Sequence, residues 1–306
     1  MATLEMQGTG SSDKVKMMYY AEEFRQLMSG IYRQEELQKI KDASISISGV
    51  GGSAGSYLLD ILVRKGFETF NLAEPDIYDL RNLSRQLFAN TQTIGRPKLD
   101  IAVEHALRIN PQLTINCYAS VDAENAEDFT RSCTVMAYQA EGFSAWALTR
   151  YMCSRYKIPF VNVSRKRKGN LRSVIATTVF DYRDGEPFTA DELEFDSFGI
   201  QGDLARIVKE MFIQGRIRQD LLDECDRVHN EFKKKRRFTN LGDLYPEVGP
   251  ITDRYPDDYF KRYSDPEICL IAGALAARTI TDLVVNRITE VRELDIFSRK
   301  SAGQKQ

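Results

Sequence analysis

The sequence predicts an α/β protein with a Rossmann-like, mostly parallel sheet, helices on both faces, an N-terminal helical arm and a late insertion. Strand and helix signals alternate from about Ala43 onward, a pattern typical of a parallel sheet. The run Ser44–Ser48 breaks into glycines, after which a helix is expected to begin near Ser56. A strand, a glycine turn and a helix together form a seat for a phosphate, because the helix N-terminus offers free N–H groups.

Ahead of the sheet, residues 1–42 are expected to form a disordered tail over 1–12 and one or two helices between Lys14 and Lys41. The first domain then spans residues 43–180. Its expected elements are, in order, a strand at Ser44–Ser48, a helix at Ser56–Lys65, a strand at Thr69–Ala73, a helix at Pro97–Ile109, strands at Leu113–Tyr118 and Cys133–Tyr138, a helix at Ala145–Tyr156, and strands at Pro159–Val163 and Leu171–Phe180.

The sequence changes character after this domain. Residues 181–255 are rich in turn dipeptides, and we interpret them as a crossover insertion that carries substrate contacts. Residues 256–306 are expected to complete the domain, and their small apolar residues favour close packing against the sheet or at a dimer seam. The elements expected in the two regions are helices at Gln201–Gln214, Arg218–Lys235 and Pro266–Asn286 and a strand at Glu290–Ile296.

The glycines after the first strand each have a mechanical role. Gly49 and Gly51 allow a tight turn whose backbone lies close to a ligand, and Gly52 completes the run. Gly55 lets the following helix approach the strand. Such turns also close ordinary βαβ units, so the motif alone is a weak signal for nucleotide binding.

A second group of polar residues follows the strand Thr69–Ala73. Glu74 stands where a doubly wound fold carries the acid that binds a ribose hydroxyl. The residues beyond it supply two cations and two amides, more than a pyrophosphate on a helix end needs, and they suit a triphosphate better than a nicotinamide cofactor. The candidate binding residues of this group are Glu74, Asp76, Asn82, Arg85, Gln86 and Lys98.

These motifs together resemble the ThiF/MoeB/HesA family, which includes the adenylation domains of ubiquitin-activating enzymes. The matching series runs through residues 41–111 as Gly-x-Gly-Gly-x-x-Gly, acid-x-Asp, Asn-Leu-x-Arg-Gln, Gly-x-Pro-Lys and Ile-Asn-Pro. The resemblance implies a Rossmann-like homodimer or pseudo-dimer that binds ATP and adenylates a carboxylate, often the C-terminus of a peptide or small protein.

The resemblance also implies catalytic roles. Lys98 would reach the α-phosphate, Arg85 the β- and γ-phosphates, and Asn82 the phosphate and metal region, although each is also compatible with a solvated turn or helix start. Arg25 resembles an arginine that relatives insert into the partner's ATP site. Arg33 competes for that role, and a plain helix-surface arginine is the alternative.

The metal sites depart from the family pattern. The aspartate that binds magnesium in relatives falls on Glu141, and the neighbouring acid falls on Tyr138. A glutamate still suits magnesium but shifts the oxygens in a site that demands octahedral order. No zinc is expected, because the chain has no Cys-x-x-Cys pair and only two histidines. Cys225 lies where some relatives keep a thioester cysteine, but its acidic neighbours oppose a reactive thiolate.

Composition excludes several other classes. The content of 42% hydrophobic and 28% charged residues is typical of a globular protein. The net charge of −2 gives the chain as a whole no electrostatic attraction to nucleic acid. No apolar run reaches membrane-spanning length and the first residues lack a signal peptide, so we expect a cytoplasmic protein without a membrane partner. The basic run Arg165–Lys168, directly after an expected strand, is the candidate for recruiting an acidic substrate segment or an RNA backbone.

The sequence therefore predicts an ATP- and magnesium-dependent adenylyltransferase of the ThiF/MoeB type, acting as a homodimer on a carboxylate of a peptide or small protein. Maturation of a peptide natural product is one branch that fits. Two alternatives stay open. One is a non-catalytic scaffold partner of an adenylating heterodimer, and the other is a carboxylate-cyclising tRNA dehydratase.

Overall fold

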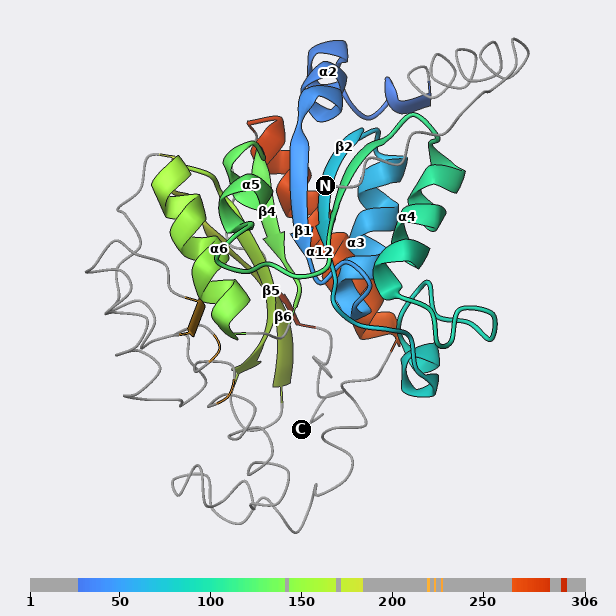
Figure 1. Ribbon diagram of the computed structural model, residues 1–306. Coiled ribbons are helices and arrows are strands. Elements are labelled where there is room, and N and C mark those ends of the chain that lie inside the picture. Colours follow the sequence, from blue (N-terminus) through green and yellow to red (C-terminus); the bar gives the residue numbers. More distant parts are fainter. Residues whose placement is uncertain are drawn as a thin grey trace, which may run out of the picture.

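In the part of the chain that the computed structural model describes, seven strands form one sheet in the order β3-β2-β1-β4-β5-β6-β7 (Figure 1). The structure describes residues 27–140, 143–168, 172–183, 219–220, 223, 227, 266–286 and 293–295. The named elements are α2 (Gln34–Asp42), β1 (Ser44–Ser48), α3 (Ser53–Arg64), β2 (Thr69–Ala73), the 3-10 helix η1 (Leu80–Ser84), α4 (Lys98–Ile109), β3 (Thr114–Tyr118), α5 (Ala126–Arg131), β4 (Val135–Tyr138), α6 (Phe143–Tyr156), β5 (Phe160–Lys168), β6 (Arg172–Phe180), α12 (Pro266–Val284) and β7 (Glu293–Asp295).

The predicted α/β fold with a mostly parallel sheet is confirmed. Strands β1 to β5 pair in parallel, whereas β6 and β7 join the sheet edge in antiparallel fashion. The two late segments expected to add strands do so as β6 and β7. Outside the described residues lie the expected tail, the helix at Gln201–Gln214, and most of the helix at Arg218–Lys235.

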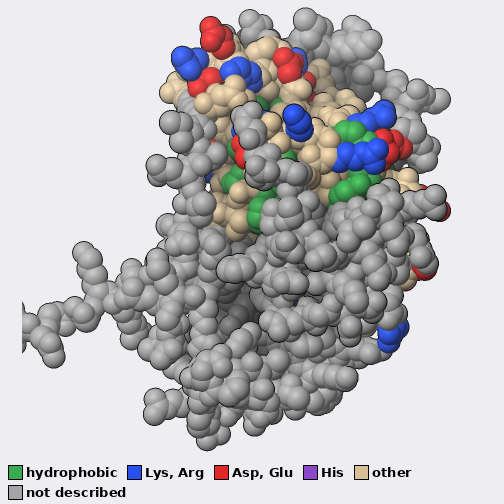
Figure 2. All heavy atoms as spheres, turned by 90° about the vertical axis from the view of Figure 1, so that its left-hand side faces the viewer, with side chains coloured by type: hydrophobic (Ala, Val, Ile, Leu, Met, Phe, Trp, Pro, Cys, Tyr) green, Lys and Arg blue, Asp and Glu red, His purple; other side chains and the backbone are tan. Residues whose placement is uncertain are grey.

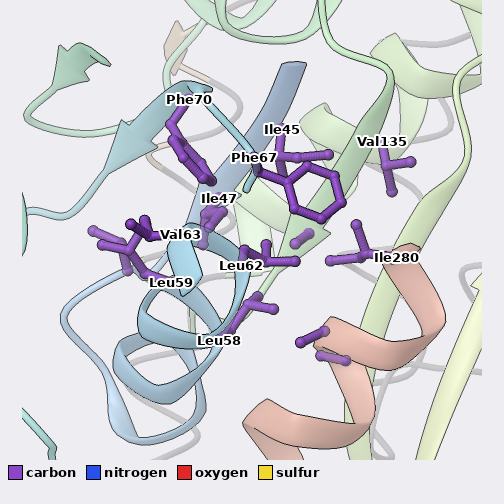
Figure 3. Packing of buried hydrophobic residues seen from close by; sticks show 14 of the residues in the cluster. Ile45, Ile47, Leu58, Leu59, Leu62, Val63, Phe67, Phe70, Val135 and Ile280 are labelled. Carbon is purple, nitrogen blue, oxygen red and sulfur yellow. The ribbon is translucent and has the colours of Figure 1, made fainter. Parts of the chain in front are cut away.

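Helices cover both faces of the sheet because side chains alternate along each buried strand (Figure 1). One face packs against α3 and α12, with Ile45 and Ile47 of β1 next to Leu58, Leu62 and Ile280 (Figure 3). The other face packs against α5 and α6 through Met136, Tyr138 and Phe160.

Among the boundaries that differ from the prediction, two bear on the candidate site. Helix α3 begins at Ser53 rather than near Ser56, because Gly52 already has the extended backbone of an N-cap. Strand β5 continues to Lys168 and pairs with β6 along its whole length, so Arg165–Lys168 lies within a strand and does not follow one. The expectation that this run directly follows a strand was therefore wrong, although the run still lies beyond Asn162, where the pairing of β5 with the carboxyl end of β4 stops. Long antiparallel pairing overrode a local signal for a strand end.

The surface is mixed in charge where the structure describes it. On the described part of the face in Figure 2, basic and acidic side chains are interspersed. Among the described residues, no helix is both long enough and apolar enough to cross a membrane.

Candidate functional site

The candidate site lies at the carboxyl ends of β1, β2 and β4. Strand β1 has β2 on one side and β4 on the other. Strands β2 and β3 therefore extend the sheet in one direction from β1, and β4 and β5 extend it in the opposite direction. Ligands of open α/β sheets bind in the crevice at such a switch point. The glycine turn follows β1 and Glu74 follows β2, so both come from the carboxyl ends of two neighbouring parallel strands.

Gly49 begins the turn in a conformation that favours glycine. Its φ is +84°, and a Cβ placed on it would lie 2.5 Å from the backbone nitrogen of Ala140. The Gly49 N–H donates to the Ala73 carbonyl at 2.8 Å, and the Gln139 N–H donates to the Ser48 carbonyl at the same distance. The turn is therefore pressed between the ends of β2 and β4, which leaves no room for a side chain.

The start of α3 packs directly onto this turn. A Cβ on Gly55 would lie 2.1 Å from the Gly49 carbonyl oxygen. The first i to i−4 bond of the helix runs from the Ser56 N–H to the Gly52 carbonyl, so the amides of residues 53–55 precede the hydrogen-bonded ladder. These amides and the positive end of the helix dipole make a seat for an anion.

Glu74 is tied to the turn. Its carboxylate accepts hydrogen bonds from the Gly51 N–H at 2.9 Å and from the Asp76 N–H at 3.2 Å, through different oxygens. Glu74 is only 7% exposed, and this burial raises the pKa of its carboxyl while the charge of Lys98 opposes the rise. Each oxygen keeps a lone pair beyond the bond it already accepts, so the group can still accept from a ribose hydroxyl.

Lys98 is the first residue of α4, and its side chain lies against the glycine turn. A Cβ on Gly51 would lie 2.4 Å from the Cβ of Lys98, so the lysine stem lies against the glycine. Its ammonium donates to the Asp76 carboxylate at 3.1 Å. Lys98 is 5% exposed, whereas the Asp76 side chain is 65% exposed. A buried ammonium held by a carboxylate that lies mostly in solvent can exchange that partner for a phosphate oxygen.

Tyr78 is a site residue that sequence reasoning missed. Its hydroxyl donates to the Gly51 carbonyl at 3.2 Å, and the Lys98 Nζ lies 5.7 Å from the centroid of its ring. The sequence around Tyr78 gave little indication of this role, because a single aromatic residue in a polar loop predicts only that its side chain is buried. Gln139, which follows β4, was also missed, although its backbone closes one side of the turn.

The structure brings Arg85 to the start of α3. Its Nε donates to the Ser53 hydroxyl at 3.1 Å, and its Nη1 donates to the Arg81 carbonyl at 2.8 Å. A guanidinium therefore lies beside the anion seat. The Asn82 side chain instead accepts from the Asp79 N–H at 2.9 Å and caps η1. Gln86 is buried, and its Oε1 has no hydrogen-bond partner among the described residues.

Of the remaining candidates, the structure describes Arg33 and Tyr138, and neither is part of this cluster. Arg25, Glu141 and Cys225 lie outside the described residues. Arg33 caps α2, beyond the amino end of β1, and pairs with Glu36 at 3.5 Å (Figure 1). Tyr138 is buried in the core, where its ring stacks on that of Phe160 at a centroid distance of 6.1 Å.

Metal ligands are sparse in the part of the chain that the structure describes. Within it, no three side chains of His, Cys, Asp or Glu gather closely enough to hold a metal ion. Glu74 and Asp76 are the acids of the cluster, and both already accept hydrogen bonds from the protein. Cys153 and Cys269 are buried, in helices α6 and α12 respectively.

Comparisons with known proteins agree with this architecture. The ThiF family model matches residues 24–291. A probable molybdopterin-synthase adenylyltransferase of Gracilaria tenuistipitata var. liui is 27% identical over 175 residues, which cover 54% of this chain and 47% of that protein. A tRNA threonylcarbamoyladenosine dehydratase of Haemophilus influenzae is 30% identical over 119 residues, which cover 38% and 45%.

Among solved structures, PaaA aligns over 96% of this chain and 76% of its own, with a TM-score of 0.52. At 14% identity, this likeness concerns the fold alone. The chain spans less than half the length of the two curated relatives described above.

Proposed function

The chain belongs to the ThiF family, and on that basis we propose that it binds ATP at the glycine turn and adenylates a carboxylate, releasing pyrophosphate. The observation that carries the proposal is the buried Lys98 ammonium, which lies beside the anion seat and is held by the exposed carboxylate of Asp76. A nicotinamide cofactor would give this lysine and Arg85 no evident task. Adenylation would use both.

Each residue of the cluster has a task that its contacts support. The turn and the amides of residues 53–55 would hold the phosphates, and Glu74 would accept a ribose hydroxyl. The Lys98 ammonium would give up its bond to Asp76 and would then stabilise the negative charge that develops on the α-phosphate. Arg85, beside Ser53, would bind the β- and γ-phosphates of the leaving group.

Catalysis of this kind needs no covalent intermediate with the enzyme. The carboxylate attacks the α-phosphorus, pyrophosphate leaves, and the product is a mixed anhydride of the acid and AMP. Alignment of the two reactants and charge stabilisation by Lys98 can together remove on the order of 10 kcal/mol from the barrier.

The substrate we propose is a carboxylate on a peptide or small protein, and the working unit is a homodimer in the cytoplasm. Arg25 would then enter the partner's ATP site and stabilise the leaving pyrophosphate. Maturation of a peptide natural product fits this substrate class. Support for all of these rests on the family, because Arg25 lies outside the described residues.

A dehydratase is the second candidate. The similarity to a tRNA threonylcarbamoyladenosine dehydratase favours it, since that chemistry also suits activation of a carboxylate by ATP. Pyrophosphate exchange into ATP, measured with peptides, small proteins and modified tRNA in turn, tests both candidates. Exchange that appears only with tRNA would replace the peptide proposal, and absence of exchange with every substrate would favour a non-catalytic scaffold.

Glu141 is the proposed magnesium ligand. Magnesium would screen the phosphate charges when bound. Glu141→Gln keeps the size of the side chain and removes its charge, so exchange activity should fall by about tenfold to a hundredfold while the fold stays intact. Glu141→Asp, which restores the family residue, should keep appreciable activity. A loss of less than about threefold in Glu141→Gln would contradict the assignment.

A further inference from the structure

Tyr78 connects three parts of the candidate site. It follows β2, its hydroxyl reaches the glycine turn, and its ring lies beside the lysine that begins α4. The side chain is only 1% exposed. A buried tyrosine hydroxyl that had no partner would cost free energy, so its bond to the turn is a fixed part of the packing.

The backbone of Tyr78 is itself held firmly. Its N–H donates to the Arg96 carbonyl at 3.0 Å, and its carbonyl accepts from the Gly95 N–H at 2.9 Å. Ile77 and Pro97 form an antiparallel bridge next to these bonds, and the Lys98 N–H donates to the Asp76 carbonyl at 2.9 Å. The segment that carries Tyr78 and the segment that leads into Lys98 are therefore one rigid pair.

The hydroxyl of Tyr78 fixes one side of Gly51, and Glu74 fixes the other. The Gly51 carbonyl accepts from Tyr78 at 3.2 Å, while the Gly51 N–H donates to Glu74 at 2.9 Å. Glycine has more backbone freedom than any other residue, so these two bonds remove freedom where it is largest. Burial, and secondly the charge of Glu74, raise the pKa of the Tyr78 hydroxyl, so it remains a donor at neutral pH.

The ring of Tyr78 acts on Lys98. The Lys98 Nζ lies 5.7 Å from the ring centroid, within the range of a cation–π contact. Among the described residues, the ammonium thus contacts both the Asp76 carboxylate and the ring. Only the carboxylate must be given up when a phosphate arrives, and the ring keeps the ammonium near the turn.

We propose that Tyr78 is a positioning residue that holds both the glycine turn and the Lys98 ammonium in the arrangement that receives a nucleoside triphosphate. The proposal rests on the proposed function for the identity of the ligand. It adds two separate tasks within one side chain, the hydroxyl acting on the turn and the ring acting on the lysine. The two tasks can be separated by substitution.

Tyr78→Phe removes only the hydroxyl. Loss of one neutral hydrogen bond should raise the Kd for ATP by about 2- to 12-fold, with kcat for pyrophosphate exchange nearly unchanged. Tyr78→Leu also removes the ring, so kcat should fall by about tenfold in addition. Tyr156→Phe is the matched control, because Tyr156 bonds Glu127 on the opposite face of the sheet. Titration calorimetry and exchange kinetics give the two constants.

If Tyr78 had only a structural role, the Tyr78 variants would have a lower Tm, but their Kd and KM for ATP would equal those of Tyr156→Phe. That result would overturn the proposal. Deuterium exchange at the amides of residues 49–55, measured without nucleotide, tests directly whether Tyr78 restrains the glycine turn. This test remains valid even if the wild type shows no activity in the pyrophosphate assay. Faster exchange in Tyr78→Phe than in the wild type supports the proposal. Equal exchange in the two proteins overturns it, whatever the outcome for ATP.

Discussion

Gly51→Val is expected to abolish ATP binding. A Cβ at this position would lie 2.4 Å from the Lys98 Cβ and 3.2 Å from a Glu74 carboxylate oxygen. The valine would therefore displace the lysine stem and the proposed ribose acid at once, as well as fill the space that a phosphate needs beside the turn. Titration calorimetry with ATP should detect no binding under conditions in which the wild type binds.

Gly30→Val is the control for this substitution, because no atom lies within 4 Å of a Cβ placed on Gly30. That variant should bind ATP as the wild type does. Circular dichroism should show that Gly51→Val keeps its secondary structure, since the clash is confined to the site. Equal affinity for ATP in Gly51→Val and the wild type would mean that the glycine turn is not the nucleotide site.

Lys98→Ala is expected to reduce pyrophosphate exchange by about 100-fold or more, because it removes a charge that acts where the transition state becomes more negative. The effect should fall on kcat. A lysine that contributed only to ground-state binding would raise KM and spare kcat. Radiolabelled pyrophosphate exchange at several ATP concentrations separates the two cases.

Lys39→Ala is the matched control, because Lys39 lies exposed on α2 beyond the amino end of β1. Its exchange activity should equal that of the wild type. The Lys98 variant needs a second comparison, because removal of the lysine also leaves Asp76 without its ion pair. Asp76→Asn should retain exchange activity within about tenfold if the carboxylate only holds the ammonium between turnovers. Full exchange activity in Lys98→Ala would overturn the role assigned to the lysine.

Local patterns in the sequence predicted most of the fold. The alternation of strand and helix signals predicted β1, β2 and α4 to within a residue, because burial on a sheet or against a helix imposes a short period on the chain. Strand β5 was one exception. Its polar second half, through Lys168, is stabilised by pairing with β6 and not by a local apolar pattern.

The sequence by itself determined the family, the α/β fold and the residues that could surround a phosphate, because glycine spacing and the order of the motifs are local properties. Only the tertiary structure decided how these residues engage one another. Tyr78 meets Gly51 across 27 positions and Glu74 meets it across 23, and neither contact has a local signal. The physical reason is that parallel pairing of β1 with β2 brings the ends of both strands together, so the packing of the sheet determines which side chains share the site.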